Sequence, residues 1–235
     1  HRALPCESLI YLGDGKNCPY GSQSAERIKE LAEASVRELV ERGCKMVVVA
    51  CNTATAAAIS HLRATFDIPI VGLEPAVKPA CAMTRSKIIG VIATFRSLQG
   101  EKFLSTVERY GQGVEVIKAV GEGFVEAVEQ NAEHEPKTEE LVRRVVEPII
   151  ERGADVIVLG CTHYPFLRNV ISKVVGERDV AIIDSGAAVE RRVESLLDEY
   201  GLRASEDNNP SLEFITFADE EYRLRLERKA KSIDL

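Results

Sequence analysis

The chain carries one stretch twice, first as Glu41-Arg42-Gly43, an apolar run and Ala50-Cys51-Asn52-Thr53, and then as Glu151-Arg152-Gly153, an apolar run and Gly160-Cys161-Thr162-His163. The second copy follows the first by 110 residues, from Glu41 to Glu151 and from Cys51 to Cys161. In each copy a helix ends at glycine, a buried strand follows, and a cysteine stands at the carboxyl end of that strand. The repeat predicts two related α/β units whose cysteines occupy equivalent places.

The rest of the chain alternates short apolar runs with amphipathic helices. Strands are expected at 9–12, 46–50, 68–71, 88–92, 114–120, 156–159 and 180–183. Helices are expected at 22–42, from about 52, at 138–152 and at 187–199, and the polar stretch 204–211 reads as a loop. Near-continuous apolar strands between helices predict an α/β fold with mainly parallel sheets.

The two predicted units would face one cleft and be related by a pseudo-two-fold axis. Strand 212–217 needs a sheet to join, and the second unit is already complete by about residue 184. The expected division is therefore 1–92 plus 185–235 for the first domain and 93–184 for the second.

Composition excludes several classes of function. The 235 residues are 45% hydrophobic and 29% charged, which is ordinary for a globular protein. The net charge of −7 argues against nucleic acid or an anionic membrane surface as a partner. No apolar run approaches the roughly 20 residues of a membrane span. Six cysteines without a Cys-x-x-Cys pair, and no secretion signal, predict free thiols, no structural zinc site and a cytoplasmic location.

The two repeated cysteines are the candidates for chemistry, because polar side chains follow both of them. A single cysteine after a buried strand is most often a small core residue. We interpret the other four as packing or incidental residues: Cys6, Cys18, Cys44 and Cys81. Ligands bind outside the carboxyl ends of parallel strands, so Cys51 and Cys161 are expected in one cleft. Backbone N–H groups and a following helix are expected to lower both pKa values and to attract a carboxylate.

Two thiols on opposite faces of a carbon atom can invert its configuration. One thiolate removes a proton from one face, the opposing thiol delivers a proton to the other, and the roles exchange in reverse. A single thiol would instead favour acyl transfer or another nucleophilic route. The sequence has no visible Ser-His-Asp arrangement, P-loop, Gly-x-Gly-x-x-Gly motif or pyridoxal-phosphate lysine, so the expected chemistry needs no cofactor and no metal.

Several motifs resemble those of the glutamate racemases, in the aspartate/glutamate racemase family. The runs Ala50-Cys51-Asn52-Thr53-Ala54 and Gly160-Cys161-Thr162-His163-Tyr164-Pro165 are similar to the two signature motifs of that family. Gly13-Asp14 with Pro19-Tyr20-Gly21 resembles a third motif, and Glu74-Pro75 and Asp184-Ser185-Gly186 also fit. The similarity extends over nearly the whole chain.

The resemblance implies a reaction, a fold and a set of site residues. The family interconverts L-glutamate and D-glutamate without pyridoxal phosphate or metal and supplies D-glutamate for bacterial peptidoglycan precursors. Its fold is two similar α/β domains around a cleft, often as a homodimer. By resemblance, Cys51 is the base toward D-glutamate and Cys161 the base toward L-glutamate, with His163 assisting proton transfer. The implied substrate-binding residues are Tyr20, Gly21, Asn52, Thr53, Thr162 and His163, and the implied assisting residues are Asp14, Thr94 and Glu129.

The sequence also departs from the family's pattern. The family opens with a strand and an Asp-Ser-Gly-x-Gly-Gly loop that supplies an aspartate and a serine, and we expect that segment to be missing because the chain starts after that point. Gly13-Asp14-Gly15 stands where the family has Gly-Asp-Thr. Ser97 stands where members commonly carry a threonine, so a hydroxyl survives there.

Two other functions stay open. A relative acting on aspartate or a hydantoin would share the paired cysteines, although the continuation His163-Tyr164-Pro165 favours glutamate. A racemase-like binding protein with a decayed site would keep the fold, although retention of both cysteines and their polar neighbours speaks against it. A thiol redox or metal protein would need cysteines close together in one local motif, which the sequence lacks.

Overall fold

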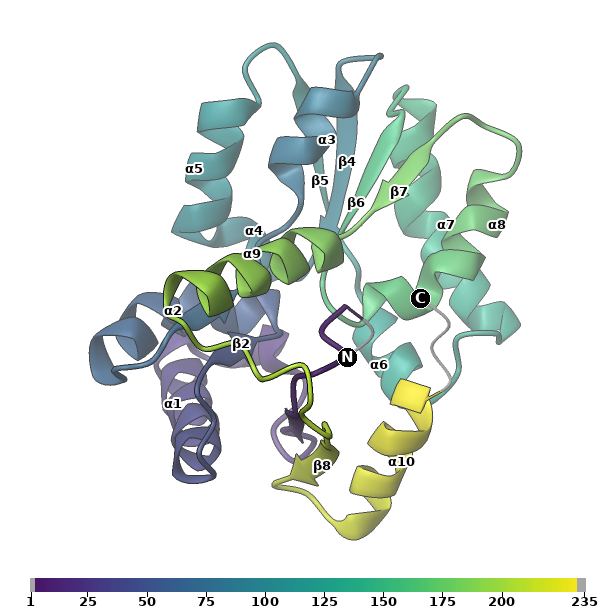
Figure 1. The fold of residues 1–235 in the computed structure, drawn as a ribbon. Coiled ribbons are helices and arrows are strands. Elements are labelled where there is room, and N and C mark those ends of the chain that lie inside the picture. The colour runs from purple at the N-terminus through teal and green to yellow at the C-terminus, as the bar shows by residue number, and fades with distance from the viewer. Residues whose placement is uncertain (1–2, 232–235) are drawn as a thin grey trace.

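The computed structural model describes residues 3–231, and its strands lie in three parallel sheets (Figure 1). The largest has the order β5-β4-β6-β7 and contains β4 (Ile88–Ala93), β5 (Glu115–Val120), β6 (Val156–Gly160) and β7 (Ala181–Ile183). The two others pair β1 (Leu9–Gly13) with β8 (Leu212–Thr216), and β2 (Val47–Val49) with β3 (Ile70–Gly72). Every one of these strand pairs is parallel, which confirms the predicted α/β class.

Helices cover both faces of the four-stranded sheet (Figure 1). On one face lie α3 (Val77–Met83) and α5 (Glu101–Tyr110), and on the other lie α7 (Pro136–Glu151) and α8 (Arg168–Val175). Successive side chains of a strand point to opposite faces. Val156 and Val158 of β6 therefore pack toward α3, whereas Ile157 and Leu159 pack toward α7 and α8.

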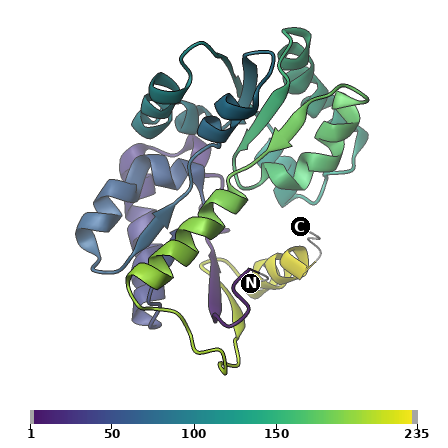
Figure 2. The ribbon, with the colours of Figure 1, turned by 45° about the horizontal axis from the view of Figure 1, so that its top comes forward.

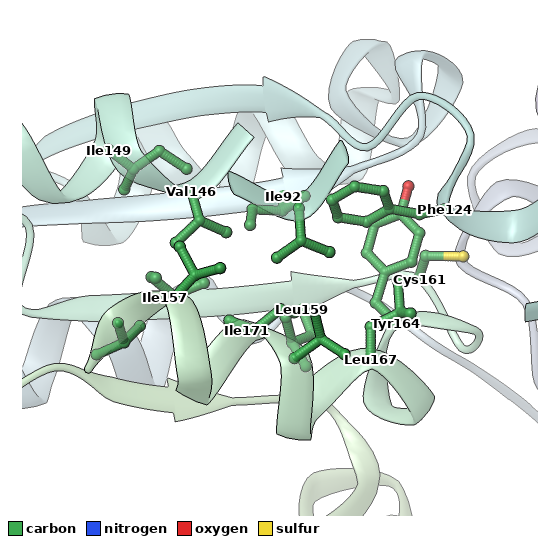
Figure 3. Packing of buried hydrophobic residues seen from close by; sticks show 14 of the residues in the cluster. Ile92, Phe124, Val146, Ile149, Ile157, Leu159, Cys161, Tyr164, Leu167 and Ile171 are labelled. Atoms are coloured by element: carbon green, nitrogen blue, oxygen red, sulfur yellow. The ribbon is translucent and has the colours of Figure 1, made fainter. Parts of the chain in front are cut away.

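The central strand β6 ends where the core ends. Figure 3 shows Ile157, Leu159 and Ile171 packed together, with Cys161 at the edge of the cluster and its sulfur directed away from them. The ring of Tyr164 is fully buried edge-on against Phe124, with centroids 5.2 Å apart. This packing fixes the chain on both sides of Cys161.

The two smaller sheets have their own helices. These are α1 (Ala25–Glu41), α2 (Asn52–Thr65) and α9 (Gly186–Glu199). The first two pack on each other and on β2 and β3, whereas α9 packs on β3 through Val193, Leu196 and Leu197. Figures 1 and 2 both show α9 crossing between the four-stranded sheet and the rest of the molecule. α1 starts later than predicted because the Ser24 hydroxyl caps it, accepting the N–H of Arg27.

The C-terminal segment returns to the beginning of the chain. β8 runs beside β1 in register from Leu9–Leu212 to Gly13–Thr216, so the strand expected at 212–217 joins a strand near the beginning of the chain. Helix α10 (Glu220–Lys231) then reaches α6 (Phe124–Glu129), where Arg225 Nη2 lies 3.8 Å from Glu129 Oε2. Within residues 3–231 no helix is both long enough and apolar enough to span a membrane.

Strand β4 changes one expected domain boundary. A division after residue 92 would leave 88–92 with the first unit, yet β4 pairs with β5 and β6. Helix α3 packs against the same sheet, so the chain crosses to the second unit before α3. We place the boundary there and keep the rest of the division, 93–184 against 185–235, as a proposal.

Candidate active site

One cavity of about 1070 Å³ brings both copies of the repeat together. Its lining contains Cys51, at the end of β2, and Cys161, at the end of β6. The cavity also extends between β1 and β2, which do not pair with each other in the described chain. Most of the residues expected at the site line it: Asp14, Tyr20, Gly21, Cys51, Thr53, Thr94, Glu129, Cys161, Thr162 and His163.

Cys51 stands at the N-cap of α2. Its Sγ accepts the backbone N–H of Ala54 at 3.4 Å, as a hydroxyl or carboxylate does at other helix starts. Burial raises the pKa of the thiol, and the N–H groups of Ala54 and Thr53 oppose that rise without cancelling it.

Cys161 is held just after β6 and just before the 3₁₀ helix η2 (Tyr164–Leu167). Burial raises its pKa to about 12, the N–H of His163 opposes the rise, and the negative charge of a Cys51 thiolate adds to it. The sequence predicted lowered pKa values at both thiols, and that prediction is wrong because burial outweighs the backbone N–H groups.

His163 connects Cys161 to a carboxylate. Its Nδ1 lies 3.9 Å from Cys161 Sγ, and its Nε2 lies 2.8 Å from Oε1 of Glu129, the last residue of α6. The hydrogen bond from His163 lowers the pKa of Glu129, although burial works in the opposite direction. A carboxylate that holds one ring nitrogen fixes the orientation of the other toward the thiol.

Three hydroxyl groups form a cluster beside Cys51. Thr53 Oγ1 lies 2.8 Å from Thr94 Oγ1, which lies 2.9 Å from Ser97 Oγ. Thr94 also caps α4 (Phe95–Gln99) by accepting the N–H of Ser97. Ser97, which stands where family members commonly carry a threonine, therefore still contributes a hydroxyl group to this hydrogen-bond network. The cluster supplies donors for a small anionic ligand.

Tyr20, in the 3₁₀ helix η1 (Tyr20–Ser22), donates its phenolic hydrogen to Asp14 Oδ2 at 2.6 Å. Burial and then this hydrogen bond raise the pKa of Tyr20, so the phenol keeps its proton. Asn17 donates to the same carboxylate at 2.8 Å. These two hydrogen bonds hold Asp14 in the cavity lining.

Asn52 is the exception among the expected substrate-binding residues. Its side chain is buried under the start of α2 and is absent from the cavity lining. Its Nδ2 has no hydrogen-bond partner within the described residues, which is costly for a buried amide group. A substrate-binding role for Asn52 stays a prediction.

The lining residues that the sequence did not indicate include Tyr11, Cys18, Phe95 and Tyr222. Cys18 directly precedes Pro19-Tyr20-Gly21, and that position was the available signal. Its Sγ lies within 4.8 Å of donor atoms of Glu129 and His163, so these three residues could hold a metal ion. Tyr222 comes from α10, and nothing in its local sequence points to the cavity.

The chain is similar to known proteins over most of its length. The Asp/Glu/Hydantoin racemase family profile matches residues 1–193. A glutamate racemase of Herpetosiphon aurantiacus is 44% identical over 216 residues, which cover 92% of this chain and 85% of that protein.

Solved structures are similar over the same extent. Escherichia coli glutamate racemase in complex with L-glutamate and the activator UDP-MurNAc-ala superposes with a TM-score of 0.84 at 30% identity, over 97% of this chain and 87% of that one. A glutamate racemase of Francisella tularensis in complex with D-glutamate gives a TM-score of 0.82 at 25% identity, over 97% and 85% of the two chains.

Proposed function

The chain belongs to the Asp/Glu/hydantoin racemase family, and from this premise we propose that it interconverts L-glutamate and D-glutamate with two thiols acting on opposite faces of the α-carbon. The observation that carries the proposal is the placement of Cys51 and Cys161, from different sheets, in one cavity lining. As the family resemblance implies, the D-glutamate formed would supply peptidoglycan precursor synthesis.

In the direction from D-glutamate, the Cys51 thiolate takes the α-proton and the Cys161 thiol delivers its own proton to the opposite face. The reverse direction exchanges the two roles. Because burial raises the pKa of both thiols, few thiolates are present near neutral pH, and the backbone N–H groups beside Cys51 and Cys161 stabilise those that form. His163, held by Glu129, assists at Cys161.

The substrate carboxylates would be bound by the hydroxyl cluster and by backbone N–H groups. Thr53 and Thr94 offer hydroxyl donors, and the first turn of α2 offers N–H groups with the positive end of the helix dipole. Thr162, Tyr20 and Gly21 also line the cavity as proposed binding residues, with Gly21 beside Thr94. A homodimer and a cytoplasmic location remain predictions from the resemblance.

The direct test is racemisation by the full-length protein in deuterium oxide. We expect each glutamate enantiomer to lose its optical rotation toward zero while deuterium enters at the α-carbon. Aspartate should react at least about tenfold more slowly, since one methylene in a binding pocket is worth about 10- to 200-fold in specificity.

Three outcomes would contradict the proposal. Faster turnover of aspartate or a hydantoin would assign a different substrate within the family. Binding of glutamate without deuterium incorporation would indicate a binding protein. Racemisation without deuterium incorporation would exclude proton transfer through exchangeable thiols.

A further inference from the structure

Cys18, Glu129 and His163 bring three different metal-ligand types to one place in the cavity. Each comes from a separate segment: Cys18 from the loop after β1, Glu129 from the end of α6, and His163 from the turn after β6. One ligand atom of each lies within 4.8 Å of the others, and all three side chains are half-buried. Cys18 has no role in the two-thiol reaction.

We propose that these three residues form an inhibitory site for a thiophilic divalent cation, with Zn²⁺ as the best-fitting ion. Zn²⁺ binds cysteine sulfur, histidine nitrogen and carboxylate oxygen together, commonly with three protein ligands and one open position. A tetrahedral Zn²⁺ separates its ligand atoms by about 3.5 Å, given bonds of about 2.0–2.3 Å. The His163–Glu129 pair at 2.8 Å must open slightly to admit the ion, and the Cys18 sulfur already lies within 4.8 Å of a ligand atom of each of the other two residues.

The charges around the three residues also allow a cation. Glu129 brings one negative charge, and the Cys18 thiol brings a second when the metal displaces its proton to solvent. Arg225 faces the other Glu129 oxygen, Oε2, at 3.8 Å, which leaves Oε1 on the side of His163. Hard cations such as Mg²⁺ prefer oxygen ligands, so the sulfur and nitrogen donors discriminate against them.

Metal binding would act on catalysis through His163. A metal on Nε2 takes the nitrogen that now contacts Glu129, and the remaining proton then resides on Nδ1, which lies 3.9 Å from Cys161 Sγ. The ring can no longer take up a proton, and Glu129 no longer orients it. Racemisation needs both thiols, so disabling the Cys161 side stops both directions. This inhibitory effect, unlike the binding itself, rests on the proposed function.

The test compares Cys18→Ser with Cys81→Ser in the full-length protein. Cys81 is also a half-buried free thiol, but it lies against the core of the four-stranded sheet, outside the cavity lining. Racemisation is measured against Zn²⁺ concentration, relative to each variant's own metal-free rate, without thiol reductants. Cys18→Ser should raise the half-inhibitory concentration by at least about tenfold, because even outer-shell changes cost about 10- to 100-fold in metal affinity. Cys81→Ser and the wild type should agree, and Mg²⁺ should not inhibit.

A second measurement does not need catalysis. Co²⁺ bound to a thiolate gives a charge-transfer absorption in the near ultraviolet, and we expect this band in the wild type and in Cys81→Ser but not in Cys18→Ser. Equal inhibition of all three proteins would overturn the proposal, because the metal would then inhibit without Cys18. A Co²⁺ band that survives in Cys18→Ser would overturn it as well. If the band depends on Cys18 and the protein does not racemise glutamate, the metal site stands and the proposed function fails.

Discussion

Glu129 shows how a single residue can act at a distance from the reacting carbon. Its carboxylate holds His163 Nε2 at 2.8 Å, and the other ring nitrogen faces Cys161. Glu129→Gln keeps the size of the side chain but removes its charge. We expect kcat to fall by about 10- to 100-fold, the usual cost of losing a group that orients a functional ligand or base, with a much smaller change in KM. Kinetics with both enantiomers would measure this.

A matched control for Glu129 lies on α7. Glu140 is exposed there and does not line the cavity, so Glu140→Gln should behave like the wild type. If Glu129→Gln raised KM and left kcat unchanged, Glu129 would contact the substrate and would not act through His163. Equal melting temperatures of the two variants would show that the difference is not a loss of folding.

For individual residues, the sequence predicted which side chains line the cavity better than it predicted how buried those side chains are. The repeat brought out Cys51 and Cys161, and motif resemblance pointed to Thr53, Thr94 and Glu129, all of which line the cavity. The direction of the thiol pKa shifts was wrong, because burial depends on the whole tertiary structure and local N–H groups do not reveal it. Only the folded structure explains Gly15, which stands where the family has a threonine. A Cβ at this position would lie 2.3 Å from Cζ of Tyr222, a residue of α10.

Among the elements, the connection from α3 to β4 is held by Asp155, next to the start of β6. Its carboxylate accepts hydrogen bonds from Thr84 Oγ1 at 2.5 Å and from the N–H groups of Arg85 and Ser86 at 2.7 and 2.9 Å. Burial alone would raise the pKa of Asp155, but these three hydrogen bonds lower it well below its ordinary value. We expect Asp155→Asn to reduce the free energy of unfolding by about 1–3 kcal/mol at pH 7, measured in urea.

The pH dependence of that loss comes from the lowered pKa. The stabilisation by Asp155 is complete above its ordinary pKa of 3.8, because the carboxyl is then ionised in both folded and unfolded chains. As the pH falls below that value the unfolded chain binds the proton first, so the difference between wild type and Asp155→Asn should shrink. Asp179→Asn is the control: its side chain is exposed and pairs only with exposed Arg85 in the described structure, so its effect should stay within about 0.5 kcal/mol. A difference that persists unchanged at low pH would contradict the assignment.

Element positions were largely predictable, whereas element partners were not. Apolar runs predicted the strands at 88–92 and 156–159 within a residue or two, because a buried parallel strand must be apolar on both faces. The same runs do not reveal which strands pair. The boundary after residue 92 failed for this reason, since only the pairing of β4 with β5 and β6 shows on which side of the crossing it belongs.

For the whole molecule, the feature that matters most for function is that the two thiols in the cavity follow strands of two different sheets. Cys51 comes after β2 in the two-stranded β2–β3 sheet, and Cys161 comes after β6 in the four-stranded sheet. The repeat predicted their equivalent places, but it did not predict that different helices begin after them, α2 after Cys51 and the short helix η2 after Cys161. The two thiols therefore differ in their support, since only Cys161 has a histidine and a carboxylate beside it.

Because the two thiols have different neighbours, they can be tested one at a time in variants that keep only one of them. In the full-length protein, Cys51→Ser and Cys161→Ser should each nearly abolish racemisation, because a serine hydroxyl holds its proton far more tightly than a thiol and is a poor base near neutral pH. Each variant still keeps one thiol on one face. A glutamate analogue with chloride on the β-carbon reports that thiol: when the α-proton is removed, a Cα–Cβ double bond forms, chloride leaves, and the enamine hydrolyses to 2-oxoglutarate and ammonia.

The two variants should then eliminate opposite enantiomers. Cys161→Ser retains Cys51 and should act on the D-analogue, whereas Cys51→Ser retains Cys161 and should act on the L-analogue, with release of 2-oxoglutarate as the measurement. Combining Glu129→Gln with each variant separates the halves further: it should slow elimination by Cys51→Ser, where the active thiol is beside His163, and leave Cys161→Ser nearly unaffected. If both variants eliminated the same enantiomer, or either racemised glutamate near the wild-type rate, the two thiols would not act from opposite faces of one α-carbon.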